Sequence, residues 1–337
     1  MTNVVRGFLL GKFMPFHKGH EFLCKVAMNR VDELIVLVCS RDIEPINGPL
    51  RYQWVKGALP DKVKVIHLHR DIPQEPKDHP DFWNIWRKTI NDLVKGQIDY
   101  VFGSESYVHQ LADELNAKPF IVDIERVTFP ISGTKVRDDL TKYWQFLPSN
   151  VQASYRKRVC LLGAESVGKS TLCKMLSSRF DSQAIHEYGR TYDAEFKQGK
   201  DWEAENFIEI ALGHIAIREE TVSLSNYLCF EDTDLLQTMV WAKYLLGEIP
   251  SALHELLDHW QPADEYLLLS SEVNWVDDGT RYSGDLNIRN WFFCELKMLL
   301  ETLQLNYQVI DSDNWESRQT QATKVVERVL SSLSVFK

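Results

Sequence analysis

One stretch of sequence decides the fold of the second half of the chain: Val159-Cys160-Leu161-Leu162-Gly163-Ala164-Glu165-Ser166-Val167-Gly168-Lys169-Ser170-Thr171. It reads as a short apolar run, then Gly-x-x-x-x-Gly-Lys-Ser, then a run to Phe180 whose apolar residues recur at helical spacing. A buried strand, a glycine loop and a helix in this order form the pattern of a phosphate-binding loop. The glycines let backbone N–H groups turn towards a phosphate, and the helix adds the positive end of its dipole.

The polar residues of this loop have distinct expected tasks. Lys169 would reach the β- and γ-phosphates of a nucleotide, and Ser170 would ligate Mg²⁺. An ordinary glycine-rich turn is the alternative, but such a turn needs neither a strand before it nor a helix after it. The other loop residues that we expect to bind ATP phosphates are Gly163, Glu165, Ser166, Gly168 and Thr171.

Length and composition limit the class of protein. The chain has 337 residues, enough for two ordinary domains, with 44% hydrophobic and 26% charged residues. No apolar run is long enough to span a bilayer, the N-terminus lacks a secretory signal pattern, and the six cysteines include no Cys-x-x-Cys pair. The net charge of −10 argues against a basic, nucleic-acid-binding face. We therefore expect a cytoplasmic protein without nucleic-acid or membrane partners, and the sequence leaves a homo-oligomer open.

The first half of the chain alternates strands with helices. This alternation predicts an α/β domain around a mostly parallel, doubly wound sheet, in which ligands bind beyond the carboxyl ends of the strands. The segments 11–20 and 103–105 follow two of the strands and would face one crevice. The apolar runs typical of strands are residues 4–10, 34–38, 63–68, 100–102 and 120–122.

Two short segments of this half carry polar residues at helical spacing. His17 and His20 are three residues apart at the start of a helical run, so both could donate to a phosphate near a helix N-terminus. Ordinary surface histidines or a metal-binding pair are the alternatives, and no third metal ligand is evident nearby. Further along, Ser132 can cap a helix on which Thr134 and Arg137 could face one phosphate, unless this is simply a capped surface helix.

Together, His17-Lys18-Gly19-His20 and Ile131-Ser132-Gly133-Thr134-Lys135-Val136-Arg137 resemble the two signatures of the nucleotidylyltransferase superfamily. The resemblance implies a Rossmann-like adenylyltransferase, in which a substrate phosphate attacks the α-phosphate of ATP and releases pyrophosphate. It further implies that His17 and His20 neutralise the triphosphate, while Ser132, Thr134 and Arg137 hold its β- and γ-phosphates. The remaining expected ATP-binding residues of this half are Gly11, Lys12 and Phe13.

An aromatic-rich stretch offers a site for a flat ring. Trp83 and Trp86 lie three residues apart on a predicted helix, where they could anchor the core or stack on a cationic pyridinium. In nicotinamide mononucleotide adenylyltransferases, a tryptophan in a comparable stretch stacks on the ring. Glu105 would contact the same substrate, and Asp71 could line the same crevice.

A polar, proline-containing segment separates the two halves. We therefore expect a nucleotide adenylyltransferase domain at residues 1–147, a linker at 148–156 and a P-loop domain at 157–337.

In the second half, carboxylates follow a predicted strand at residues 227–230. Asp232 is the first choice, and Asp234 the second, for the acidic group that orients Mg²⁺ beside a phosphate-binding loop. The alternative is that either aspartate caps the next helix. A later loop, residues 274–281, and Arg289 could form a lid whose arginines, Arg281 among them, reach the transferring phosphate.

This half resembles the ribosylnicotinamide kinase domain of bifunctional NadR-type proteins. The resemblance is carried by the phosphate loop, Glu187-Tyr188-Gly189-Arg190, Asp232-Thr233-Asp234, and Trp275 with Asp278-Gly279-x-Arg281. It covers nearly the whole chain, since the order of the two domains also matches. The sequence departs from the family at Val167, where a serine is usual. We expect no helix-turn-helix repressor domain, because the first motif begins almost at residue one.

The resemblance implies that ATP phosphorylates ribosylnicotinamide to nicotinamide mononucleotide, which the first domain then adenylylates to NAD. A carboxylate among Glu187, Asp193 and Asp232 would accept the proton of the attacking hydroxyl. Trp275 or Tyr192 could stack on the nicotinamide. The other expected contacts to the nucleoside are Tyr188, Arg190 and Asp278.

Two other functions use comparable features. A phosphopantetheine adenylyltransferase joined to a dephospho-CoA kinase has the same architecture, but paired tryptophans suit a flat cationic ring better than a flexible pantetheine. A nucleotide-sensing regulator would keep the binding residues with reduced turnover.

Overall fold

The computed structural model describes residues 4–197, 199–271, 285–312 and 314–334. The chain divides into two compact units, one up to Ser154 and one from Tyr155 to Leu333. Among the described residues, no helix combines the length and the apolar character needed to cross a membrane.

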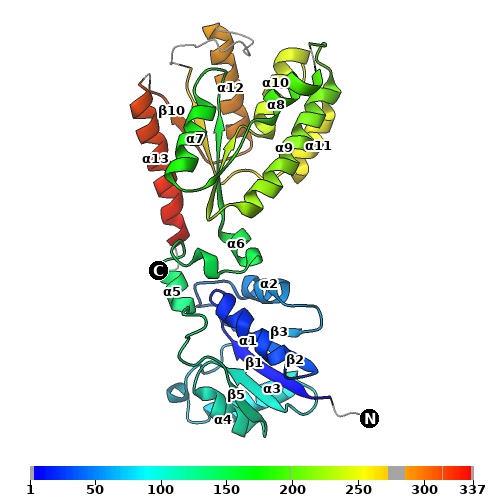
Figure 1. The fold of residues 1–337 in the computed structure, drawn as a ribbon, viewed down its shortest axis with the longest axis vertical. Helices are drawn as coiled ribbons and strands as arrows, with labels where there is room; N and C mark the ends of the chain where they lie inside the picture. Colours follow the sequence, from blue (N-terminus) through cyan, green and yellow to red (C-terminus); the bar gives the residue numbers. More distant parts are fainter. Residues whose placement is uncertain (1–3, 198, 272–284, 313, 335–337) are drawn as a thin grey trace. The chain divides into compact units, whose positions relative to one another are not determined.

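A five-stranded, fully parallel sheet forms the centre of the first unit (Figure 1). Its strands, in the order β3-β2-β1-β4-β5, are β3 Lys64–His69, β2 Glu33–Ser40, β1 Arg6–Gly11, β4 Tyr100–Gly103 and β5 Lys118–Ile121. Its α-helices are α1 Lys18–Met28, α2 Gly48–Ala58, α3 Phe82–Leu93, α4 Tyr107–Glu114, α5 Gly133–Asp138 and α6 Ser149–Tyr155.

Both faces of this sheet are covered. Phe8, Ile35 and Leu37 are buried in one cluster with residues of α3 and α4. Leu9 and Val36 point to the opposite face, because side chains alternate along a strand, and they are buried as well. Burial on both faces explains why these strands read as nearly continuous apolar runs.

The order of the strands places a crevice at the end of β1. Because β1 lies between β2 and β4, the chain winds outwards in one direction up to β3 and in the other direction from β4 onwards. Ligands of such sheets bind at this switch point, beyond the carboxyl ends of the two central strands. Here those ends are Gly11 and Gly103.

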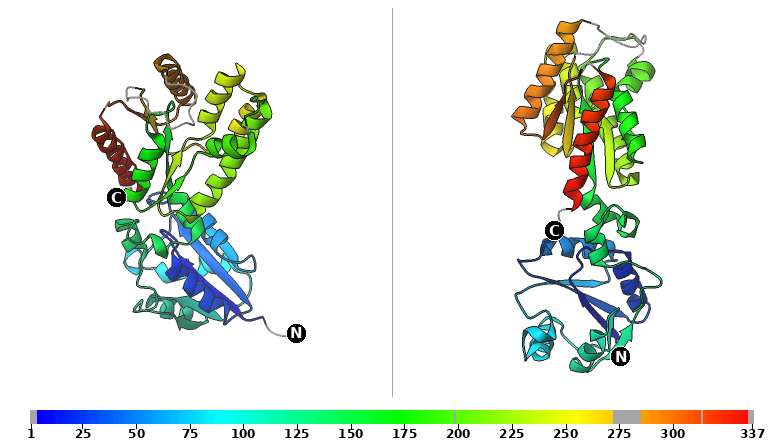
Figure 2. Two further views of the ribbon diagram at one scale, coloured as in Figure 1. Left: turned by 45° about the horizontal axis from the view of Figure 1, so that its top comes forward. Right: turned by 90° about the vertical axis from the view of Figure 1, so that its left-hand side faces the viewer.

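The second unit also contains a five-stranded, fully parallel sheet (Figures 1 and 2). Its strands, in the order β10-β9-β6-β8-β7, are β10 Tyr307–Ile310, β9 Glu265–Leu269, β6 Lys157–Leu162, β8 Leu228–Asp232 and β7 Gln183–Ile185. Its α-helices are α7 Lys169–Arg179, α8 Tyr188–Tyr192, α9 Ala204–Leu224, α10 Leu235–Leu246, α11 Ser251–His259, α12 Leu286–Thr302 and α13 Trp315–Ser331. The strand that leads into the phosphate loop, β6, is therefore the central one.

Most elements agree with the sequence expectations, and the exceptions have a local cause. The strand expected at residues 227–230 extends to Asp232, and the strand expected at 120–122 spans Lys118–Ile121. The segment expected to be a linker, 148–156, contains the helix α6, whose Val151 is buried. Helices α2, α8, α11 and α12 were not expected, and a helix at α10 was expected only in the alternative in which Asp232 or Asp234 is its cap. Helices α2 and α10 bury polar residues or apolar residues on most sides, so their sequences show little periodicity.

The central position of β6 makes its core residues critical for the stability of the second unit. Leu161 is fully buried, so Leu161→Ala should lower the free energy of unfolding of this unit by about 2–5 kcal/mol. Leu224→Ala is the matched control, because Leu224 is 78% exposed and its truncation should change stability by less than about 0.5 kcal/mol. Urea unfolding checks both variants, and equal destabilisation would contradict this packing.

Candidate active sites

A large cavity opens at the switch point of the first sheet. Its volume is about 860 Å³, within the range of about 300–1,000 Å³ that is usual for small-molecule sites. Segments 11–20 and 103–105 both line it, as the parallel sheet predicts. The cavity also brings together all the residues of this half that the sequence singled out for ATP or nicotinamide binding: Gly11, Lys12, Phe13, His17, His20, Trp83, Trp86, Glu105, Ser132, Thr134 and Arg137.

The two signature segments, more than a hundred residues apart in sequence, are in direct contact. The Arg137 guanidinium donates through Nη1 to the carbonyl oxygen of Met14 at 2.5 Å. A Cβ atom on Gly133 would lie 2.6 Å from the same oxygen, so this close approach requires glycine. Ser132 caps α5, because its hydroxyl accepts a hydrogen bond from the amide of Lys135 at 3.2 Å.

His17 and His20 form a stacked pair at the start of α1. Their ring centroids are 3.6 Å apart, and Nδ1 of each ring accepts a hydrogen bond from the backbone amide of the other residue at 3.3 Å. Each neutral ring therefore carries its proton on Nε2, which makes Nε2 the donor available to a ligand. Burial, assisted by the positive charge of Arg126, lowers the pKa of His17 to about 3. The pKa of His20 is also lowered, by burial and by the neighbouring His17.

The side chain of Arg126 also lines this cavity, although the sequence did not predict it as a site residue. It lies in a left-handed turn, with φ of 54°, within a loop organised by Asp123. The Asp123 carboxylate accepts hydrogen bonds from the amides of Val127, Thr128 and Phe129 at 2.8–3.2 Å. Arg126 pairs with Glu105 at 3.4 Å and brings positive charge close to His17.

The two tryptophans differ in their surroundings. Trp86 is 6% exposed and donates through Nε1 to the carbonyl oxygen of Pro73 at 2.9 Å, so it is largely a core anchor with one edge in the cavity. Trp83 is only partly buried and lies edge-on to Phe82, which leaves it better placed to meet a ligand. Asp71 does not line this cavity, because its side chain is 90% exposed and pairs with Arg41 at 3.5 Å.

The stretch 163–168 forms a loop that leads into the N-terminus of α7. Gly163, Ser166 and Gly168 have positive φ values of 148°, 60° and 90°. A side chain on Gly168 would collide with the ring of Trp315, 2.7 Å from its Cβ position. The fully buried Arg318 also supports the loop, since its Nη1 donates to the carbonyl oxygen of Val167 at 3.1 Å.

The side chains of Lys169, Ser170 and Asp232 meet where this loop faces the end of β8. The ammonium of Lys169 donates to the carbonyl oxygens of Gly163 and Ala164 at 3.0 and 2.8 Å. Burial and the negative charge of Glu187 raise the pKa of Asp232, while Lys169 and the hydrogen bond from Ser170 act in the opposite direction. Thr171 follows at the exposed surface of α7.

Ser170 and Asp232 suit a small divalent cation. Oδ1 of Asp232 is buried and has no hydrogen-bond partner among the described residues, which leaves a carboxylate oxygen for a ligand. The described residues contain no cluster of three or more acidic, histidine or cysteine side chains that could hold a metal alone. Mg²⁺ at nucleotide sites typically takes only one or two protein ligands and completes its shell with phosphate oxygens and water.

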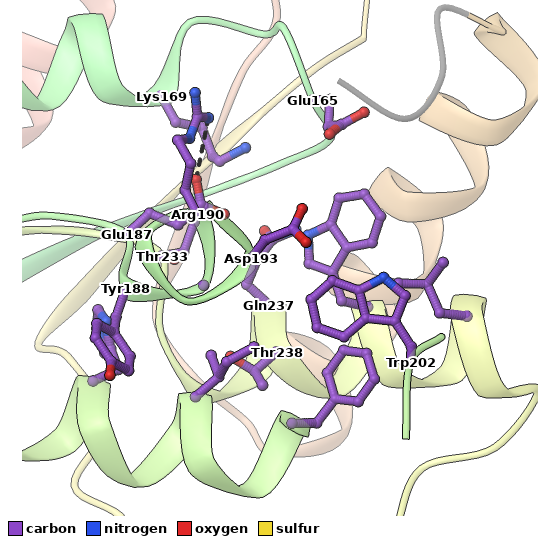
Figure 3. A pocket seen from close by; sticks show the side chains of 16 residues that line it. Glu165, Lys169, Glu187, Tyr188, Arg190, Asp193, Trp202, Thr233, Gln237 and Thr238 are labelled. Carbon is purple, nitrogen blue, oxygen red and sulfur yellow. Dashed lines mark hydrogen bonds and ion pairs between the residues drawn. The ribbon is translucent and has the colours of Figure 1, made fainter. Parts of the chain in front are cut away.

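A second cavity lies beside the phosphate loop (Figure 3). Of the residues predicted for this half, Glu165, Lys169, Glu187, Tyr188 and Arg190 line it, as does the alternative base Asp193. Its volume is about 90 Å³, so a nucleoside requires some of the lining side chains to move. The cavity is also lined by aromatic and polar residues that the sequence did not predict: Trp202, Phe207, Gln237, Thr238 and Trp241.

Two local ion pairs involve residues that line this cavity. Arg190 pairs with Glu187 at 3.3 Å, and Lys197 pairs with Asp193 at 3.7 Å. The Lys197 ammonium also lies over the ring of Trp202, 4.7 Å from its centroid. Trp202, which lines the cavity, therefore already has a cation over its indole ring.

Several expectations for the second half change. Tyr192 does not line the cavity, because its side chain is buried and its hydroxyl donates to the carboxylate of Glu209. Asp234 caps α10 through the amide of Leu236 and accepts from the hydroxyl of Tyr266, so it follows the capping alternative. Arg289 is buried on α12 instead of lying in a lid. The predicted residues Trp275, Asp278 and Arg281 lie outside the described part of the chain.

The two units match two known domain families. Residues 8–139 match the family described as Cytidylyltransferase-like, and residues 158–318 match the family described as AAA domain. Both units are therefore nucleotide-binding α/β domains, the first nucleotidyltransferase-like and the second of the P-loop type.

Known proteins are similar to the whole chain or to its first unit. The trifunctional NAD biosynthesis/regulator protein NadR of Escherichia coli is 28% identical over 343 residues, 96% of this chain and 83% of that protein. The nicotinamide-nucleotide adenylyltransferase of Methanococcus vannielii is 27% identical over 158 residues, 44% of this chain and 86% of that protein. A crystal structure of NadR protein in complex with NR shares the fold, with a TM-score of 0.70 and 20% identity over 98% of this chain and 97% of that chain. With both domain families in the same order and NadR relatives aligned along nearly its whole length, this chain belongs to the NadR-type family.

Proposed function

We propose that this protein makes NAD in two ATP-dependent steps. The second unit phosphorylates ribosylnicotinamide to nicotinamide mononucleotide, and the first unit adenylylates the mononucleotide and releases pyrophosphate. One observation carries the proposal: the first cavity joins both signature segments and the aromatic stretch in one space of about 860 Å³. Its anion-binding side and its aromatic side suit a triphosphate and a flat pyridine ring. The NAD biosynthesis named for the NadR relative supports the same substrates.

For the adenylylation step, we propose that the first cavity binds ATP through neutral and cationic donors. His17 and His20 would present Nε2–H groups to the triphosphate, and Arg137 and Arg126 would add positive charge. The phosphate of the mononucleotide then attacks the α-phosphorus in line, and pyrophosphate leaves. No covalent intermediate on the protein is needed, because positioning and charge stabilisation can supply the rate enhancement. Trp83 is the proposed partner of the pyridine ring.

For the phosphorylation step, the phosphate loop and Lys169 would hold the β- and γ-phosphates. Ser170 and Asp232 would hold Mg²⁺, which supplies positive charge to the phosphate oxygens when bound. Glu187 is the proposed acceptor of the proton from the attacking ribose hydroxyl, because it lines the cavity and its charge reaches Asp232. The nicotinamide ring would pack among Trp202, Phe207 and Trp241.

The two activities should separate genetically. Lys169→Ala should lower the phosphorylation rate by about 100-fold or more and leave adenylylation unchanged, because a single phosphate-binding donor contributes about that much. His20→Ala should have the opposite effect. Rates are measured on purified protein with Mg-ATP and either ribosylnicotinamide or the mononucleotide. Loss of both activities in either folded variant would show that the sites are not independent.

The protonation state of the histidines gives a second prediction. With a pKa of about 3, His17 is neutral throughout the range from pH 5 to pH 8, so the chemical shift of its Cε1 carbon should stay constant in the free protein. The rate of adenylylation should accordingly not fall as the pH rises through about 6.5, the ordinary value for histidine. A fall with an apparent pKa near that value would instead show that an imidazolium binds the triphosphate.

A further inference from the structure

Gln237 is a buried amide whose orientation is fixed by the phosphate loop. It is 2% exposed and lies in the first turn of α10. Its Oε1 accepts a hydrogen bond from the backbone amide of Gly163 at 3.2 Å. Because that amide can only donate, the oxygen of Gln237 must face it, and the NH₂ group points the other way. Nε2 is buried and has no hydrogen-bond partner among the described residues.

The side chain lies on the wall of the second cavity, as Figure 3 shows. The lining residues of α10 follow one another along its face: Gln237, Thr238, Trp241 and Leu245. The polar pair is at the helix end next to the phosphate loop, and the apolar pair is one and two turns further on. A nucleoside must bring the hydroxyl that attacks phosphorus to the loop, so its ring points to the apolar end. Its sugar then lies at the level of Gln237.

The chemistry of the wall determines which atom Gln237 can bind. The carboxylates that line the cavity, Glu165, Glu187 and Asp193, are acceptors and can take hydrogen bonds from sugar hydroxyls. The free NH₂ of Gln237 can only donate, so it requires an acceptor lone pair, which the oxygen of a sugar hydroxyl has. A sugar hydroxyl can bind both kinds of group at once: it donates its proton to a carboxylate, and its oxygen accepts a hydrogen bond from the Gln237 amide.

We propose that Gln237 donates through Nε2 to the oxygen of the 2′- or 3′-hydroxyl of the nucleoside, and so selects ribosides over deoxyribosides. This assignment rests on the proposed kinase activity. The same side chain accepts a hydrogen bond from the Gly163 amide, so it fixes the position of the sugar relative to the phosphate loop. A buried donor that is satisfied only by substrate favours the substrate that carries the hydroxyl, because the deoxy analogue leaves the donor unpaired.

The test compares ribosylnicotinamide with its 2′-deoxy and 3′-deoxy analogues. The wild-type enzyme should have a kcat/KM for one deoxy analogue that is about 10- to 100-fold lower than for the riboside. Gln237→Glu keeps an oxygen that accepts from the Gly163 amide but loses the NH₂ donor. Gln237→Met loses both the acceptor oxygen and the NH₂ donor. Both variants should lose activity on the riboside far more than on that analogue, so the preference collapses to a few-fold. The identity of the affected analogue assigns the hydroxyl.

Two controls accompany these variants. Gln308→Met changes an exposed glutamine on β10 and should leave the preference intact. Adenylylation of the mononucleotide by the first unit should be unchanged in every variant, and urea unfolding should show that the second unit is folded in each of them.

Two results would overturn the assignment. If a variant lowers kcat/KM for the riboside and for both analogues by the same factor, Gln237 acts only through Gly163. If the variants keep the wild-type preference for the riboside over the deoxy analogue, Gln237 binds no hydroxyl. A wild-type enzyme that neither binds nor phosphorylates ribosylnicotinamide would overturn the proposed kinase activity itself, and this assignment with it.

Discussion

A protein with a net charge of −10 must hold a polyanionic nucleotide, and this electrostatic constraint shapes both units. Each unit solves this problem at the carboxyl end of its central strand, where a glycine-containing turn leads into a helix. Backbone amides and the helix N-terminus provide positive potential there without adding many charged side chains. A few cations complete each site: Arg137 and Arg126 in the first unit and Lys169 in the second.

The acidic residues at the end of β8 show how local partners separate the roles of similar side chains. Glu231 is fully buried, and although burial opposes its ionisation, His214 and Arg158 hold its pKa below the ordinary value. Burial raises the pKa of Asp234 to about 6, and this residue caps a helix. Asp232, between them, faces Ser170 and Lys169 and keeps an unpartnered oxygen. Only the middle carboxylate is therefore available to a metal–nucleotide complex.

Sequence alone located the candidate residues whose positions follow from backbone geometry. His17, Ser132 and Lys169 stand at strand-to-helix corners, and such corners have a recognisable order of glycines, caps and apolar runs. Residues that depend on tertiary contacts were missed. Gln237 lies in a helix that reads as buried core, and Arg126 lies in a turn without periodicity. Among the neighbouring aromatic residues, local spacing could not show that Tyr192 turns towards Glu209 while Trp202 faces the cavity.

The central claim is that two separate phosphate sites act in succession on one nucleoside. It is tested most directly by following the label from ATP into NAD with unlabelled ribosylnicotinamide as the starting material. Two-site chemistry predicts that label at the γ-phosphate appears in NAD as the phosphate next to the nicotinamide riboside, and that label at the α-phosphate appears as the phosphate next to adenosine. Failure to recover NAD, or NAD that carries label from the α-phosphate alone, would contradict it.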